Sequence, residues 1–399
     1  MPAASSPTVA RGPGPGRRPE RTARARSGSA RPTGRERREA ARRQAEEARA
    51  GVERRGLPAF TLVVGMAAVV ALICGIALVT GFLSPPGGSG PASTAPAATL
   101  HTLVRADAVA DVAEAAGSGW VLDDGAGTIR RFDPASGAFT GPARHVGQRP
   151  VSVAADDGKL WVADAVGNAV VVIDPRTGRP TGTPIAVGQE PVSVAAGPGG
   201  VWVASLGASV VSLIDTRSRT VVASVALPGG AVRVTTGDGA AWVTGTSDTL
   251  ARVSPKPVGV SLSWKAVRVG QGPIGVVAAP GAVWVADAVG GAVSRVDPVH
   301  VRVTATYRLG ANGAVTGTET VRAALGQGTS DPVAVAWFDG LLWVGDGRAA
   351  TVSAFDPATG KAHGAPARLP GVPRRLVTED DLLLAATANP GTLVALGPS

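Results

Sequence analysis

Short apolar runs separated by turn residues dominate the chain after residue 99. Residues 150–187 contain one full unit, in which the runs PVSVAA, KLWVAD, AVVVID and TPIAVG follow one another. The turns between them include Asp157-Gly158 and Gly167-Asn168. Tight antiparallel turns favour these residues, because Gly and Asn accept a positive φ angle and Asp accepts a hydrogen bond from the turn backbone. The pattern predicts a small four-stranded antiparallel sheet.

The unit repeats with a period of about 40 residues, which is typical of propeller blades. One anchor tryptophan marks each copy, at Trp120, Trp161, Trp202, Trp242, Trp284 and Trp343, and a seventh copy has Leu384 at this position. A single small sheet would leave two apolar faces in water, so each copy must pack against two neighbours. We expect the anchor tryptophans to fill the space between blades, and a stacking ledge for a ligand is the alternative.

The two ends of the repeat region predict a closed ring. The seventh copy ends after three strands, and the strand-like run TLHTLVRA (99–106) precedes the first copy. We expect this run to complete the last blade, because pairing the two ends hides both edges of an open array. Residues 99–399 are therefore predicted to form an all-β, seven-bladed β-propeller. An insertion near 311–330 is the one irregularity of the repeat. It is expected to be a lid or a partner contact, with a neutral spacer as the alternative.

The repeated motif is Pro-x-x-Val-Ala, then Gly-x-Leu/Val-Trp-Val-Ala-Asp, then Val-x-x-Ile-Asp-Pro-x-Thr-Gly. It resembles YVTN-type and NHL-like propeller repeats, and it is similar to streptogramin B lyase propellers and to extracellular sensor propellers of some bacterial receptor kinases. The resemblance covers roughly residues 100–399 and implies the fold, because many unrelated activities use this ring.

The lyase relatives imply a metal ion and a catalytic histidine in the central funnel. The four histidines of this chain, His101, His145, His300 and His363, all fall on predicted outer strands or turns. A general base must lie within hydrogen-bond reach of its proton, so that lyase mechanism is not expected. The 56-residue tail is also too short to contain a kinase domain.

An uncharged segment precedes the repeats. Residues 59–83 contain no charged residue, and a helix of this length crosses a hydrocarbon core of about 30 Å. We predict a transmembrane helix over 57–83, with a cleavable signal peptide as the alternative. Residues 84–98, rich in Pro, Gly and Ser, are expected to be a flexible linker.

Positive charge is concentrated in the first 56 residues, which hold fifteen Arg, no Lys and six Glu. The rest of the chain is balanced, with 24 basic and 24 acidic residues, so nothing beyond the tail requires a nucleic-acid partner. Arg54 and Arg55 precede the span, and this bias predicts a cytoplasmic N-terminus and an extracytoplasmic propeller. The tail (1–56) is expected to be largely disordered and to contact anionic lipid, with docking to nucleic acid or to a cytoplasmic partner as the alternative.

Polar residues at the start of the first strands are candidates for ligand binding. They are Asp111, Arg149, Glu190, Arg233, Gln271, Asp331 and Arg375. Asp111, Arg233 and Arg375 replace the small residue that stands nine positions before the anchor elsewhere. Such a charge must face water or find a partner, because a lone buried charge is costly. Asp111 with Arg375 suggests a structural pair across the closure, whereas Arg233 suggests contact with an anionic ligand.

Aspartate recurs three residues after the anchor, at Asp123, Asp164, Asp287 and Asp346. These carboxylates suggest an acidic rim that binds a divalent cation, or a turn repeated by duplication. We predict a non-catalytic propeller that binds a ligand or an envelope protein. The alternatives are a metal-dependent extracytoplasmic lyase or hydrolase with its site in the funnel, and a scaffold subunit of a membrane complex.

Overall fold

The computed structural model describes residues 99–106, 108–256, 261–310, 315–319, 331–379 and 382–397, with the backbone alone at Thr99, 315–319 and Gly397. All of these residues belong to one compact unit. The predicted tail, membrane helix and linker lie outside the described residues. Among those that are described, no helix is long and apolar enough to cross a membrane.

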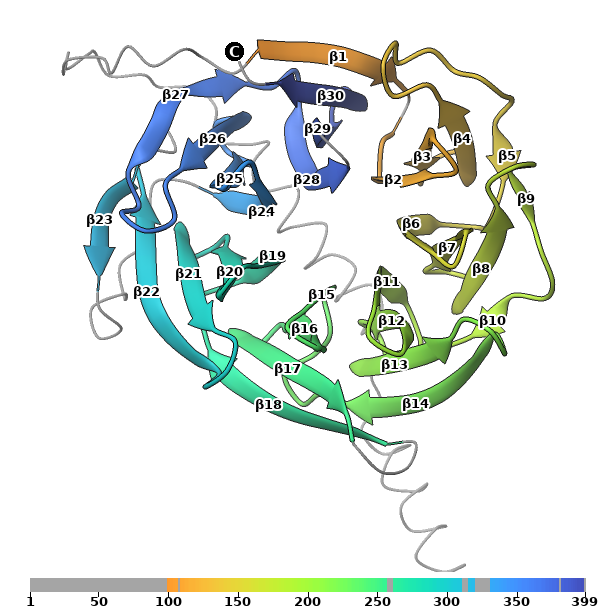
Figure 1. The fold of residues 1–399 in the computed structure, drawn as a ribbon, viewed down its shortest axis with the longest axis horizontal. Coiled ribbons are helices and arrows are strands. Elements are labelled where there is room, and N and C mark those ends of the chain that lie inside the picture. The colour runs from red at the N-terminus through yellow and green to blue at the C-terminus, as the bar shows by residue number, and fades with distance from the viewer. Residues whose placement is uncertain are drawn as a thin grey trace, which may run out of the picture. The chain divides into compact units, whose positions relative to one another are not determined.

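Seven antiparallel sheets surround a common centre, as Figure 1 shows. The innermost strands are β2 (Asp111–Ala115), β6 (Pro150–Asp156), β11 (Pro191–Gly197), β15 (Arg233–Gly237), β19 (Pro273–Ala279), β24 (Pro332–Phe338) and β28 (Val372–Glu379). Each packs against the innermost strand of the next sheet, and β28 packs against β2. The predicted all-β seven-bladed propeller is therefore confirmed, and we number its blades 1 to 7 from β2 to β28.

The second and third strands form the body of each blade. The second strands, which carry the anchor residues, are β3 (Ser118–Asp123), β7 (Lys159–Asp164), β12 (Gly200–Ser205), β16 (Ala240–Thr244), β20 (Ala282–Asp287), β25 (Leu341–Asp346) and β29 (Leu382–Ala388). The third strands are β4 (Thr128–Phe132), β8 (Ala169–Asp174), β13 (Val210–Asp215), β17 (Thr249–Pro255), β21 (Ala292–Asp297), β26 (Thr351–Phe355) and β30 (Thr392–Gly397). The turn between β6 and β7 has positive φ at both Asp157 (49°) and Gly158 (64°), as its Asp-Gly sequence predicts.

The outermost strands differ between blades. Blades 3 to 6 have long ones, β14 (Thr220–Ala226), β18 (Leu262–Arg268), β22 (Arg302–Leu309) and β27 (Ala362–Arg368). Blades 1 and 2 have only β5 (Arg144–His145), and β9 (Arg179–Pro180) with β10 (Ile185–Ala186). Prolines at 142, 180 and 184 fall in these two segments, and a proline has no amide to donate to a neighbouring strand. Of the fourth strand expected at 183–188, only the two residues of β10 form, and β9 precedes them on the same edge of β8.

The last blade is closed by the start of the repeat region. Strand β1 (Thr99–Arg105) pairs antiparallel with β30, with His101 opposite Ala395. Figure 1 shows β1 beside β30 at the outer edge of blade 7. Blade 7 is thus built from both ends of the region, in the order β1-β30-β29-β28. The predicted closure is confirmed.

Part of the insertion adds a strand to blade 5. Strand β23 (Val315–Glu319) pairs antiparallel with β22, with Thr306 opposite Glu319. It lies on the perimeter of the ring (Figure 1), on the side of β22 away from the centre. The remaining residues of the predicted insertion, 311–314 and 320–330, lie outside the described residues. The five described residues extend a sheet rather than form a loop.

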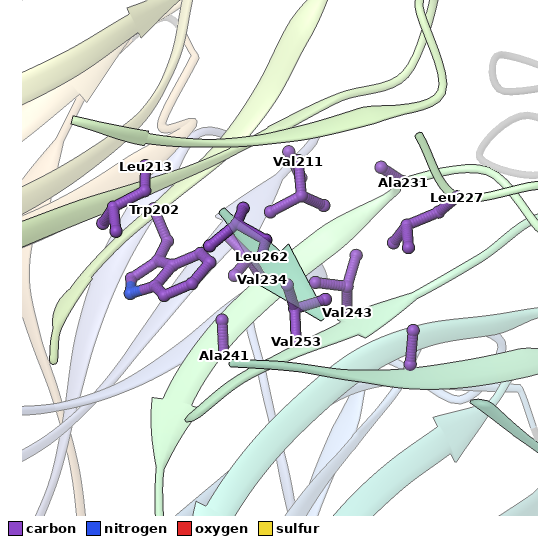
Figure 2. Packing of buried hydrophobic residues seen from close by; sticks show 12 residues of the cluster. Trp202, Val211, Leu213, Leu227, Ala231, Val234, Ala241, Val243, Val253 and Leu262 are labelled. Atoms are coloured by element: carbon purple, nitrogen blue, oxygen red, sulfur yellow. The ribbon is translucent and has the colours of Figure 1, made fainter. Parts of the chain in front are cut away.

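The anchor tryptophans lie between blades, as expected. Trp202 of blade 3 belongs to one apolar cluster with Val234, Ala241 and Val243 of blade 4 (Figure 2). Its side chain has an exposed fraction of 0%, and its indole Nε1 donates to the Pro198 carbonyl oxygen at 3.1 Å. A buried ring leaves no face for a ligand, so the ledge alternative fails for Trp202.

The two kinds of tryptophan position predict different stabilities. Replacing Trp202 with alanine should lower the free energy of unfolding by about 3–5 kcal/mol, because it empties a buried site between blades. Trp264→Ala, at a side chain that is 43% exposed on β18, should cost less than about 1 kcal/mol. Urea unfolding of both purified variants measures the difference. Equal losses would contradict the role of the anchor position.

Candidate functional site: the central channel

A cavity of about 310 Å³ lies in the central channel against the innermost strands of blades 4 to 7. Among the described residues its wall contains three charged side chains, Arg233 of β15 and Arg374 and Arg375 of β28, and no aspartate or glutamate. The rest of the wall is mostly apolar or backbone, with Val276 and Trp337 among its residues. The charged side chains that the structure places on this wall are therefore all basic.

A repeated β-bulge exposes one residue at the start of five innermost strands. In β6, for example, the register shifts between Pro150 and Ser152. The two flanking residues are buried, but Val151 between them is partly exposed. The bulge residues of blades 2, 3, 5, 6 and 7 are Val151, Val192, Ile274, Val333 and Arg374. A bulge re-aims a side chain, so blade 7 presents an arginine where four other blades present an aliphatic residue.

The residue after the bulge connects neighbouring blades. Ser152 Oγ of blade 2 accepts a hydrogen bond from the Val194 amide of blade 3 at 3.2 Å. Ser193 Oγ of blade 3 accepts one from the Val234 amide of blade 4, also at 3.2 Å. This is the position nine residues before the anchor, where a small side chain reaches the next innermost strand. Arg233 departs from that rule and lines the cavity instead.

Asp111 and Arg375 form an ion pair across the closure, as their positions in the first and last blades suggested. Arg375 Nε lies 2.9 Å from Asp111 Oδ1, and Asp111 is fully buried. Asp111 Oδ2 accepts hydrogen bonds from Ser152 Oγ and the Val153 amide, each at 3.0 Å. The Asp111 carboxylate thus joins blades 7, 1 and 2, and this pair is best explained as structural.

Arg374 is the site residue that the sequence analysis missed. Its Nη1 lies 3.3 Å from both carboxylate oxygens of Asp124 in blade 1, and its side chain is 42% exposed. The departure from Val or Ile at the second residue of the Pro-x-x-Val-Ala motif was the available signal. The predicted residue, Arg375, stands at the next position of the motif.

The other predicted ligand-binding residues lie in the loops that lead into the innermost strands. Arg149 Nη2 pairs with Glu190 Oε1 at 3.1 Å, which joins the loops of blades 2 and 3. Gln271 is exposed, and its carbonyl oxygen accepts a hydrogen bond from the Gly290 amide. Burial and the nearby Asp346 carboxylate raise the pKa of Asp331 to about 6. None of these four residues lines the described cavity.

Three of the four recurrent aspartates hold backbone turns. Asp164 accepts hydrogen bonds from the amides of Gln148 and Arg149, at 3.1 and 2.9 Å. Asp123 Oδ1 accepts one from the Ala126 amide, and Asp346 Oδ1 accepts from two amides of its own turn, those of Arg348 and Ala349. These contacts favour the turn interpretation. Among the described residues, no three His, Cys, Asp or Glu side chains group so that they could hold a metal ion.

Asp287, the fourth recurrent aspartate, is fully buried and binds Ser294 Oγ through Oδ2 at 2.5 Å. Burial raises its pKa to about 8, although the Ser294 hydroxyl and the Gly270 amide oppose the shift. Asp287 Oδ1 has no hydrogen-bond partner among the described residues. At neutral pH this carboxyl is protonated, and its contribution to stability is lost as the pH rises toward 8.

The histidines lie away from the channel wall, as predicted. His101, His145 and His363 lie on β1, β5 and β27, and His300 lies in the turn after β21. The His300 ring and amide lower the pKa of Asp297 to about 2. None of the described innermost strands carries a histidine.

The Asp111 network predicts unequal roles for two neighbouring arginines. Arg375→Gln leaves Asp111 buried without its cation and should cost about 3–5 kcal/mol of unfolding free energy. Arg374→Gln breaks only an exposed pair and should cost less than about 1 kcal/mol. Urea unfolding also tests Asp111→Asn with Arg375→Gln, which should be more stable than Arg375→Gln alone. Equal effects of the two single variants would contradict the assignment.

No protein-family model and no curated protein sequence matches the chain. Solved structures do resemble its fold. Virginiamycin B lyase from Staphylococcus aureus is 15% identical with a TM-score of 0.60, over 76% of this chain and 99% of that one. The WD40 repeats of RRP9 are 14% identical with a TM-score of 0.60, over 77% and 99% of the two chains. Hydrazine synthase of Kuenenia stuttgartiensis is 15% identical with a TM-score of 0.56, over 78% and 98%. At such identities the similarity establishes the fold alone, and these proteins differ in function.

Proposed function

We propose that the chain is a non-catalytic binding propeller that receives its ligand in the central channel and is displayed outside the cytoplasm by one membrane span. The cavity on blades 4 to 7 carries this proposal. Its volume of about 310 Å³ lies within the range of about 300–1,000 Å³ that small-molecule sites occupy. Its walls are paired strands, which hold their side chains in fixed positions.

Binding fits the chemistry of this wall better than catalysis does. Its charged groups are guanidiniums, which remain protonated and serve to hold anions rather than to exchange protons. The groups that exchange protons near pH 7 are placed elsewhere, because every histidine lies on an outer strand or a turn. The propeller relatives include both a lyase and a WD40 repeat protein, so the site and not the fold supports this choice.

The predicted membrane anchor determines on which side of the membrane the propeller binds its ligand. The uncharged run 59–83 is long enough to span a bilayer, and Arg54 and Arg55 precede it. In this proposal the arginine-rich tail stays in the cytoplasm against anionic lipid. The propeller then samples solutes or envelope proteins on the other side.

A photo-crosslinker in the channel tests the proposal directly. Thr235, which lines the cavity, is replaced in the full-length chain by a diazirine-bearing aliphatic residue, and cells are irradiated. Intact-mass measurement of the purified chain should then reveal a defined adduct. The matched control places the same residue at Val299, which is 80% exposed in the turn after β21.

We expect a defined adduct at Thr235 and none of the same mass at Val299. The mass increment separates a small molecule from a protein partner. A folded Thr235 variant that gains no adduct, or the same adduct at both positions, would contradict channel binding. Circular dichroism of each variant checks that the sheets are intact.

A further inference from the structure

We infer that the channel binds a small molecule through an oxyanion group, a carboxylate or a phosphate, held by Arg374 and Arg233. This inference rests on the proposed function and specifies its ligand. Both arginines line the same cavity, Arg374 from blade 7 and Arg233 from blade 4. A guanidinium presents a planar fork of donors that matches both kinds of oxyanion.

Four other blades pack without a charge at the position of Arg374 or at that of Arg233. Four other blades fill the bulge position of Arg374 with Val or Ile, and the ring closes around them. At the position of Arg233, four other blades carry a small uncharged residue, namely Ser152, Ser193, Gly275 and Ala334, and the remaining two carry the Asp111–Arg375 pair. When a residue differs from its equivalents in the other blades and packing does not require the difference, a functional role is the expected reason. Here two such departures line one cavity.

The acidic partners of Arg374 and Arg375 differ in burial. Arg375 is neutralised by Asp111, which is fully buried and lies outside the cavity wall. Asp124 is the acidic partner of Arg374, with N–O distances of 3.3 Å and a side chain that is 24% exposed. Since that contact is partly solvated, an incoming anion can share or replace it. Arg233 lines the same wall, in which the described residues include no carboxylate.

Arg374 stands at the β-bulge between Pro373 and Arg375. It lines the cavity, and its Nη1 also contacts Asp124 of blade 1. The neighbouring Arg375 is only 20% exposed in its side chain and is used by the closure network. Arg375 thus stabilises the ring closure through Asp111, whereas the more exposed Arg374 side chain is available in the cavity. Trp337 in the same wall offers an apolar surface for the rest of a ligand.

Thermal unfolding of the full-length chain in detergent tests the inference with defined probes. Inorganic phosphate, pyrophosphate and succinate are titrated separately against potassium chloride of equal ionic strength. At least one oxyanion should raise the Tm in a saturable way beyond the chloride control, because a ligand that binds only the folded chain stabilises it. The phosphate and succinate arms distinguish the two sources of an oxyanion.

Variants then assign the effect to the site. Arg374→Gln and Arg233→Gln should each weaken the apparent affinity by about tenfold, as expected when a charge-assisted hydrogen bond is lost. Arg374→Lys should retain part of it, since the charge remains but the fork does not. Arg268→Gln is the matched control, because Arg268 lies on the outer strand β18 with a side chain that is 82% exposed.

Two results would overturn the inference. One is that no oxyanion exceeds the chloride control. The other is a saturable shift that persists unchanged in the Arg233→Gln and Arg374→Gln double variant. If either result is found together with a channel adduct at Thr235, the proposed binding function is retained and only the oxyanion inference is rejected. Absence of both the adduct and the shift would remove the two together.

Discussion

The burial of each sheet's two apolar faces against its neighbours is the constraint on which this ring depends. Every anchor residue shares a cluster with the following blade. Trp161 packs with Val203 of blade 3, Trp242 with Val285 of blade 5, and Leu384 of blade 7 with Val121 of blade 1. Because no cluster is complete within one blade, no blade is expected to be stable alone. The last contact, from blade 7 to blade 1, is what makes the array a ring.

The same constraint decides which positions are free for chemistry. Ser152 and Ser193 must stay small and polar, because each reaches the amide of the next innermost strand. Asp111 serves the same purpose with a charge, and it therefore needs Arg375. The residue at the bulge position makes no such contact with the next innermost strand, so its side chain can change without loss of packing. In blade 7 the bulge position carries Arg374, which lines the channel cavity.

Much of the fold could be predicted from the sequence, because the tryptophan period and the turn residues report directly on blade packing. The closure by residues 99–106 followed from the missing fourth strand of the last copy. The Asp111–Arg375 pair followed from their equivalent positions in the first and last copies. Sequence comparison worked at these points because each feature repeats or visibly breaks a repeat.

The features that were missed depend on geometry within the strands. The bulge that exposes Arg374 changes which residue faces the channel, and a simple alternation of faces hides it. The pairing of 315–319 with β22 depends on an exposed sheet edge outside the insertion itself. The protonation of Asp287 is set by burial, whereas the equivalent Asp164 accepts two backbone amides. Identical residues in equivalent positions thus differ in chemistry.

Closure of the ring is tested most directly by a disulfide between β1 and β30. His101 and Ala395 are opposite each other, and opposite Cα atoms in antiparallel strands lie about 4.5–5.5 Å apart, within reach of a disulfide. In a Cys74→Ser background, the His101→Cys and Ala395→Cys pair should lose both free thiols on mild oxidation and raise the Tm. The control pairs His101→Cys with Ala354→Cys, because Ala354 holds the equivalent register opposite Trp343 in blade 6. Free thiols that persist in the first pair, or equal oxidation of both pairs within one chain, would contradict a ring sealed by its two ends.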